Sequence, residues 1–587
     1  MMHFSDTIKQ SFALKLLVLL AIFLMALVFR IHNLTFDSYF MDEIHQVSFY
    51  SLPLEEVHKG ASRQQQPPLD YWVGAIVSRF ANSDFSLRLP AAIFGALSVV
   101  LLCVLIARVS SYFTAIYFSL LASILPYAIY VSQDARPYSI AIFFLLAFIL
   151  AIDNFYRADK HYLKHFFILL IVTVLFFLTR TLSPLVSIFV TGLFCFIYFI
   201  NSFVCKSADS AEIKKKMFLM QSALLLALIA AIPYYLQILV SGQRFLSESD
   251  SLSVWFSRLD LSEVIYVWIA QLEPNIVLLV IGVLFVLFTI VVDFRKQSFL
   301  LKLLAFMLIM ATLVHYGIFR FKTDYTFRPG YSIYVWPLFF ILSAVGVHRF
   351  LEFLKHHEII HKSFLVLLMM PIFLTVSACI DFKSRHLKSD WRSLSAYTNQ
   401  SESDNKVFIF EALADKENWN PSFYGSYRYP SKAEARSAAI TDFINRQSQS
   451  RLARYEYKPV LVFFHYRDYL LTANSSISLL APSFEHLELN LQDINGLNIT
   501  KIFGFTLIEL EQSLQKNSAE QLYDLIDAVI EKVPEGSSRV NLHLAAAYLT
   551  PKENHGVILR HIRAAQRYAR NDQIAYLNRA LNDFNID

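Results

Sequence analysis

The chain has 587 residues, of which 56% are hydrophobic and 17% are charged, and 53 of them are phenylalanine. A water-soluble globular protein usually carries about 25% charged residues, so this composition indicates an integral membrane protein. The formal net charge is only +5, and the basic residues collect in short loops between apolar segments, where they hold anionic lipid headgroups. A nucleic-acid partner is therefore not indicated.

Apolar stretches long enough to cross a bilayer recur along the first two-thirds of the chain. A spanning helix needs about 20 mostly apolar residues, because each residue rises about 1.5 Å. No small-residue cleavage pattern follows the first stretch, so we expect an uncleaved signal anchor there. Eleven spans are predicted, near residues 12–30, 90–108, 112–131, 138–155, 165–180, 183–204, 217–240, 274–293, 299–318, 331–349 and 363–381.

Lysine and arginine collect in the even-numbered connections between these spans. Such residues are retained on the cytoplasmic side of a membrane. With a cytoplasmic N-terminus and an odd number of spans, the odd-numbered connections and everything after about residue 382 are expected on the opposite face. The basic connections are 157–164, 206–216, 295–302 and 349–362.

The four cysteines all precede the tail that is predicted to be exported. Cys103, Cys195 and Cys379 lie in apolar spans, and Cys205 lies at a helix end. The tail therefore has no disulfide framework, which favours a bacterial cell inner membrane over an endoplasmic reticulum. The expected arrangement is multi-pass, with a cytoplasmic N-terminus and a periplasmic C-terminal domain.

The connection from residue 31 to residue 89 is too long for a simple turn. Directly after the first span it carries two adjacent carboxylates, Asp42 and Glu43. Its apolar and aromatic stretches predict short helices in the membrane interface. Adjacent carboxylates at this place indicate either a water-facing reaction site or the stabilised first turn of an interfacial helix.

Five cations are expected on the same face as these carboxylates. If the substrate is a sugar held by a phosphate on a membrane lipid, they can bind that phosphate. They also stabilise the transition state, because negative charge grows on the leaving phosphate as the glycosidic bond breaks. The alternative is a structural role, as headgroup contacts or as an ion pair with a nearby carboxylate. The five are Arg63, Arg136, Arg320, Lys322 and Arg328.

The acceptor hydroxyl must lose a proton while it attacks the anomeric carbon. A carboxylate within hydrogen-bond reach can take that proton, and we assign this role to Asp42. Glu43, Gln66 and Tyr71 are predicted to support the site or to contact the acceptor. The sequence identifies no specific cofactor. A divalent metal on Glu43 and His45 stays open as an alternative, although hard cations usually need more carboxylates than these.

Five short motifs occur in a fixed order along residues 1–400. They are Asp42-Glu43, Gln-Pro-Pro-Leu-Asp-Tyr-Trp at 66–72, Ser-Leu-Arg-Leu-Pro at 86–90, Gln-Asp-Ala-Arg-Pro-Tyr at 133–138 and Asp-Trp-Arg at 390–392. This order resembles that of the GT-C glycosyltransferases related to protein O-mannosyltransferases and the lipid A aminoarabinose transferase. The resemblance implies a polyprenyl-phosphate-linked sugar donor, an extracytoplasmic active site, inversion at the anomeric carbon, and Asp42 as the base. Relatives often have a His or a Glu-Lys where this chain has Gln65-Gln66.

The composition changes after the last predicted span. We expect a transmembrane catalytic domain over 1–381, an extracytoplasmic α/β domain over 382–514 and a helical region over 515–587. The runs 406–410 and 459–464 are rich in Val, Ile and Phe and predict buried strands. The helical region resembles tetratricopeptide-type hairpins, which would bind a protein partner, cover the active site or cap the α/β domain.

The sequence thus predicts a polytopic α-helical membrane protein of the GT-C type, with about 11 transmembrane helices and a C-terminal α/β module that ends in short helical hairpins. Its predicted function is an inverting glycosyltransferase that moves a sugar from a polyprenyl phosphate to a glycolipid, glycan or protein acceptor. The alternatives are a polymerase or ligase acting on lipid-linked oligosaccharide, a transporter of lipid-linked sugars, and an assembly scaffold. A transporter should keep ionisable residues at mid-membrane depth, whereas the charges of these spans lie almost entirely at helix ends.

Overall fold

The chain is divided into two compact units. The first comprises Met1–Phe36, Phe49–Phe245 and Arg258–Arg385, and the second comprises Asp37–Ser48, Leu246–Ser257 and His386–Asp587. The computed structural model describes residues 12–39, 41–158, 161–204, 210–248, 276–291, 298–321, 333–356, 371–377, 379–380, 390–400, 406–411, 437–439, 458–464, 497–502, 505–510, 518–533, 537–569 and 574–585.

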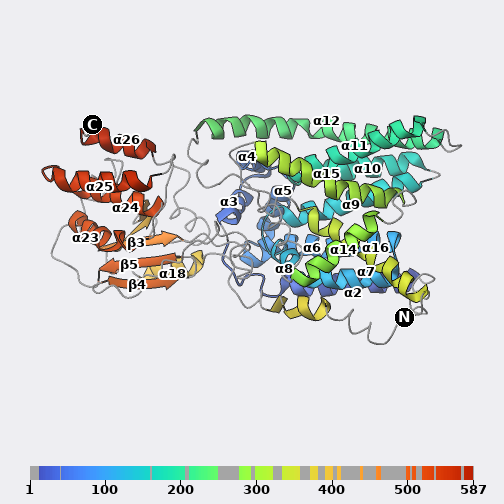
Figure 1. The fold of residues 1–587 in the computed structure, drawn as a ribbon, viewed down its shortest axis with the longest axis horizontal. Coiled ribbons are helices and arrows are strands. Elements are labelled where there is room, and N and C mark those ends of the chain that lie inside the picture. Colours follow the sequence, from blue (N-terminus) through green and yellow to red (C-terminus); the bar gives the residue numbers. More distant parts are fainter. Residues whose placement is uncertain are drawn as a thin grey trace. The chain divides into compact units, whose positions relative to one another are not determined.

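The first unit is built from apolar helices that run alongside one another (Figure 1). Its described part shows that the protein is a multi-pass membrane protein. Six helices are long and apolar enough to cross a membrane: α2 (Phe12–Ile31), α6 (Asp84–Val109), α9 (Tyr138–Arg157), α11 (Leu182–Val204), α12 (Ser210–Glu248) and α16 (Val335–His356). Further apolar helices are α7 (Tyr112–Ile124), α10 (Tyr162–Phe177), α14 (Ile276–Val291) and α15 (Phe299–Phe321).

Each of the first ten predicted spans falls on one of these helices, but three differ from the prediction. The seventh is longer than predicted, because α12 extends beyond residues 217–240 at both ends. The third span is broken, because α7 ends at Ile124 and a separate helix, α8 (Pro126–Tyr130), follows. Leu125 between them is extended, as a residue before proline tends to be. The second span starts earlier than predicted, because Ser83 caps α6 in a capping box with Ser86. The eleventh span lies mostly outside the described residues, so the count of eleven stays a prediction.

Three short helices fill the connection between α2 and α6. They are α3 (Met41–Tyr50), α4 (Leu54–Arg63) and α5 (Leu69–Phe80). Only the last two residues of α3 belong to the first unit. Within that unit, α4 and α5 lie at one end of the long helices (Figure 1). The short helices predicted for this connection are therefore present.

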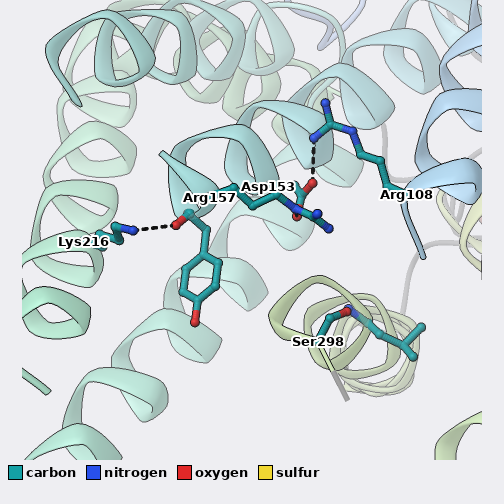
Figure 2. Close-up of polar contacts among 7 residues, drawn as sticks. Arg108, Asp153, Arg157, Lys216 and Ser298 are labelled. Carbon is teal, nitrogen blue, oxygen red and sulfur yellow. Dashed lines mark hydrogen bonds and ion pairs between the residues drawn. The ribbon is translucent and has the colours of Figure 1, made fainter. Parts of the chain in front are cut away.

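Ion pairs hold the other end of α6 and α9 together. The Asp153 side chain, which is 2% exposed, accepts hydrogen bonds from Arg108 of α6 at 2.7 Å and from Arg157 of α9 at 2.9 Å (Figure 2). Lys216 of α12 donates to the carbonyl oxygen of Tyr156 at 2.9 Å in the same region. These contacts fix α6, α9 and α12 relative to one another at this end.

The second unit contains a mixed five-stranded sheet in the order β2-β1-β3-β5-β4. Strand β1 runs parallel to β2 and β3, whereas β5 runs antiparallel to β3 and β4. Strands β1 and β3 occupy the two apolar runs that predict buried strands. The bounds are β1 (Lys406–Glu411), β2 (Ser437–Ala439), β3 (Lys458–Phe464), β4 (Leu497–Ile502) and β5 (Phe505–Leu510).

Helices pack against this sheet and against one another. Ile409, Leu461 and Ile508 of the sheet share an apolar core with Leu522 and Ile526 of the following helix. A second core joins the last three helices. The tetratricopeptide likeness of these helices stays a prediction. The helices are α18 (Trp391–Gln400), α23 (Ser518–Ile530), α24 (Ser537–Leu549), α25 (His555–Tyr568) and α26 (Ile574–Asp583).

Candidate active site

A polar junction forms in the first unit where the connections between helices meet. The Tyr50 hydroxyl donates to Oδ2 of Asp70 at 3.2 Å and lies 3.4 Å from the carbonyl oxygen of Ala135. Asp70 is only 9% exposed. Gly74 is needed beside the Tyr50 ring, because a Cβ at position 74 would overlap it. The end of α3, the start of α5 and the 132–138 turn are thereby brought together.

The Gln-Pro-Pro loop before α5 is clamped onto the segment between α10 and α11. The Leu69 N–H donates to the carbonyl oxygen of Leu178 at 3.0 Å. The Thr181 hydroxyl donates to the carbonyl oxygen of Gln65 at 2.5 Å. Gln65 has a φ of 55°, in the left-handed region that a residue with a side chain rarely adopts. These two hydrogen bonds therefore fix the loop on either side of Gln66.

Two arginines lie over one aromatic ring in the same region. The guanidinium carbon of Arg180 is 4.5 Å from the centroid of the Tyr138 ring, and that of Arg136 is 5.9 Å from it. Arg180 is 4% exposed. The negative face of the ring attracts both cations, so positive charge is concentrated at the start of α9.

A third arginine is buried in the last turn of α2. Arg30 is 1% exposed. Its Nε donates to Oγ of Ser132 at 3.2 Å, and its Nη1 donates to the carbonyl oxygens of Ala26 at 3.0 Å and Ser123 at 3.2 Å. These described partners are all neutral. Hydrogen bonds and the helix C-terminus compensate part of the cost of burying the charge, but they do not cancel the charge itself.

The two carboxylates of the first connection lie in different environments. Asp42 and Glu43 both occupy the first turn of α3. Glu43 is completely buried, whereas Asp42 is half-buried. Carboxylates in a first turn also favour the helix dipole, so the structural interpretation of the pair applies whether or not one of them reacts. The roles assigned to Asp42 and Glu43 stay predictions.

The other predicted site residues are distributed unevenly. Tyr71 is buried with its ring centroid 6.2 Å from that of Tyr50. Gln66 lies in the clamped loop. Among the predicted phosphate-binding cations, the described side chains include only that of Arg136. Lys322 and Arg328 lie outside the described residues, and the side chains of Arg63 and Arg320 are not described although their helices are.

The metal alternative gains no support from the helix geometry. Glu43 and His45 are two residues apart on α3, and side chains with this spacing do not face each other. In the described ranges, no group of three His, Cys, Asp or Glu residues is arranged to hold a metal ion.

The sequence and fold were compared with those of known proteins. No protein-family model matches the chain, and no characterised protein matches its sequence significantly. Among solved structures, ArnT from Cupriavidus metallidurans in the apo state matches with a TM-score of 0.50 and 13% identity, covering 84% of this chain and 97% of that one. The chain has the GT-C glycosyltransferase fold. The family resemblance predicted from the sequence is thus confirmed at the level of the fold.

Two further structures have scores just below that value. ArnT bound to undecaprenyl phosphate has a TM-score of 0.49 at 12% identity and covers 85% of this chain and 98% of that one. The Archaeoglobus fulgidus oligosaccharyltransferase, solved in complex with Zn and sulfate, has a TM-score of 0.49 at 13% identity, with coverages of 76% and 68%. At such identities the likeness is one of fold.

Three residues of this GT-C site were missed by the sequence analysis: Tyr50, Arg30 and Arg180. The sequence did contain a signal for Arg180. It is the last residue of the fifth predicted span, next to a short connection on the predicted exported face, where the positive-inside rule disfavours a cation. Tyr50 carried no comparable signal, because its partners Asp70 and Ala135 are distant in sequence.

Proposed function

We propose that the protein transfers a sugar from a polyprenyl phosphate to an acceptor on the extracytoplasmic face of a bacterial inner membrane. The observation that carries the proposal is the concentration of guanidinium groups beside the polar junction of a GT-C fold. Arg180 lies over the Tyr138 ring, and the described partners of Arg30 are all neutral. Guanidinium groups stay protonated, and their planar donors match the geometry of a phosphate.

A lipid phosphate is the anion that best suits this place. It sits at the membrane surface because its polyprenyl chain occupies the bilayer, and ArnT, whose fold this chain shares, has been solved with undecaprenyl phosphate bound. As the bond from the sugar to the phosphate breaks, negative charge grows on the phosphate oxygens. Fixed guanidinium groups then stabilise the transition state more than the bound donor.

The acceptor must supply the new bond to the anomeric carbon. Its hydroxyl oxygen attacks from the side opposite the leaving phosphate, so the configuration inverts. Asp42 takes the hydroxyl proton during this attack. Half-exposure keeps the Asp42 carboxylate accessible to an acceptor, whereas the fully buried Glu43 is better suited to support the site.

The acceptor is a glycolipid, a glycan or a protein. A polymerase or ligase that uses lipid-linked oligosaccharide would employ the same donor phosphate. The two differ in the number of sugars transferred per event, which mass spectrometry of the product measures. Lipid-linked sugars that accumulate in cells lacking the protein would supply the donor for such an assay.

Replacement of the proposed base tests the mechanism. Asp42→Asn preserves shape but removes the proton acceptor, so the transfer rate with the accumulated donor should fall by about 10² or more. Asp84→Asn is a matched control, because Asp84 also occupies the first turn of a helix next to the same connection. The control should keep its rate. Near-normal transfer by Asp42→Asn, in protein that folds normally, would remove Asp42 from the mechanism.

A further inference from the structure

One buried polar atom in the clamped loop has no partner. Oε1 of Gln66 is inaccessible to solvent and makes no hydrogen bond within the described part of the chain. Buried carbonyl oxygens are nearly always hydrogen-bonded, because an unpaired one loses its interaction with water and gains nothing in return. A ligand that donates a hydrogen bond to Oε1 of Gln66 would explain why this oxygen is buried without a partner from the described chain.

The loop around this atom is held in place on both sides. The left-handed φ of 55° at Gln65 ends α4, because Gln65 follows the C-cap Gln64 and the N–H groups of Gln65 and Gln66 donate to the carbonyl oxygens of Ser62 and Ala61. The Thr181 hydroxyl and the Leu178 carbonyl then fix the loop on either side of Gln66. The unpaired oxygen of Gln66 therefore lies in a loop whose backbone is held by hydrogen bonds on both sides.

The loop is also placed beside the cations. Thr181, which holds the carbonyl of Gln65, directly follows Arg180 in the chain. The Tyr235 hydroxyl lies 3.1 Å from the carbonyl oxygen of Arg180 and 3.2 Å from that of Thr181, which fixes this segment further. The Gln66 amide therefore belongs to the same rigid assembly as the guanidinium proposed to bind the donor phosphate.

We infer that Gln66 binds a hydroxyl group of the donor sugar and so helps to determine which sugar is accepted. This inference rests on the proposed function. A neutral amide is a poor partner for a phosphate beside which arginine is available, but it suits a sugar hydroxyl. An amide offers a carbonyl or an N–H, and a hydroxyl group can donate to the first or accept from the second.

The experiment compares a donor with and without its sugar. Binding of undecaprenyl phosphate, and of undecaprenyl phosphate linked to glucose, mannose, galactose or arabinose, is measured on the purified full-length protein in nanodiscs. Wild-type protein should bind at least one sugar-linked lipid more tightly than the bare lipid. Gln66→Met, which keeps the volume but removes the amide, should weaken binding of that lipid about tenfold or more and leave binding of the bare lipid unchanged.

Gln64→Met provides the matched control, since Gln64 lies in the same connection at the end of α4. It should bind both lipids as the wild type does. Equal weakening of both lipids by Gln66→Met, or no change in either, would overturn the role of Gln66. Wild-type binding of the bare lipid with no gain from any sugar would also overturn it while leaving phosphate binding intact. Failure of the wild type to bind any of these lipids would overturn the proposed function as well.

Discussion

Arginine side chains have different partners near the two ends of α9. At its C-terminal end, the Asp153 carboxylate accepts from both Arg108 and Arg157. Near its start, Arg180 lies against the ring of Tyr138. The 15 residues from position 138 to position 153 separate the two arrangements by about 23 Å along the helix axis. Guanidinium groups thus pair with a carboxylate at one end, and one lies over an aromatic ring at the other.

Arg30 is another arginine, and its described partners are all neutral. Its described partners are a hydroxyl and two carbonyl oxygens, which stabilise a guanidinium without cancelling its charge. The Asp153 contacts hold helices together through ion pairs. Around Arg30 and Arg180, hydroxyl, carbonyl and aromatic groups contact the guanidinium groups. A protein gains from such an arrangement where an anion must bind.

The largest effect on stability is expected from Asp153, near the C-terminal end of α9. Asp153→Asn leaves Arg108 and Arg157 without their shared carboxylate and should lower the free energy of unfolding by about 2–3 kcal/mol, the scale of hydrogen bonds to charged groups. Unfolding in mixed micelles with increasing SDS measures it. Glu212→Gln is the control, because the Glu212 side chain is 53% exposed in its pair with Lys216, and solvent screens such a pair, so that it contributes little to stability. Equal effects from the two variants would contradict the structural role of Asp153.

A histidine pair in the second unit predicts an effect of pH on stability that does not involve either end of α9. Nδ1 of His543 lies 3.2 Å from Nδ1 of His561, and both side chains are buried. Burial, with the neighbouring imidazole and nearby arginines, lowers the pKa of His543 to about 4, and burial also lowers the pKa of His561. The charged groups around the pair are Arg539, Arg560, Asp527 and Glu531.

Because these pKa values are lower in the folded state, the unfolded chain binds more protons between about pH 6.5 and pH 4. Stability is therefore complete above pH 6.5 and is lost as the pH falls through this window, by about 1–2 kcal/mol after allowance for solvent screening. Hydrogen exchange of α24 and α25 in the whole protein should accelerate at pH 5 relative to its intrinsic rate. His543→Gln should show a smaller change with pH, and an unchanged acid effect would exclude the pair as its source.

A smaller effect on stability is expected from Arg30. Arg30→Met leaves the buried oxygens of Ser132 and Ser123 without this donor but also removes the cost of burying a charge, so the free energy of unfolding should fall by only about 1 kcal/mol. Binding of undecaprenyl phosphate should nevertheless weaken. If Arg30→Met were as destabilising as Asp153→Asn while lipid binding stayed normal, Arg30 would have a structural role and the contrast between the two ends would fail.

Much of the fold was readable from the sequence because the bilayer imposes a length on each apolar segment. The ten helices follow from that constraint. The break before Pro126 follows from the restriction that a proline places on the preceding residue, although Pro233 lies inside α12 without ending it. The site was less accessible. Tyr50 meets Asp70, and Arg180 meets Tyr138, only through the packing of short helices and turns. The hydrogen bond from the Thr181 hydroxyl to the carbonyl oxygen of Gln65 likewise joins segments that are distant in sequence.

The most direct test compares Arg180, which lies over the first residue of α9, with Arg157, which is the last residue of that helix. Undecaprenyl phosphate binding is measured for Arg180→Gln and Arg157→Gln in the same nanodiscs. Arg180→Gln should weaken binding about tenfold or more, because a charge-assisted contact to the phosphate is lost, whereas Arg157→Gln should bind as the wild type does. Normal binding by Arg180→Gln, or equal loss in both variants, would contradict a donor-phosphate site at the start of α9.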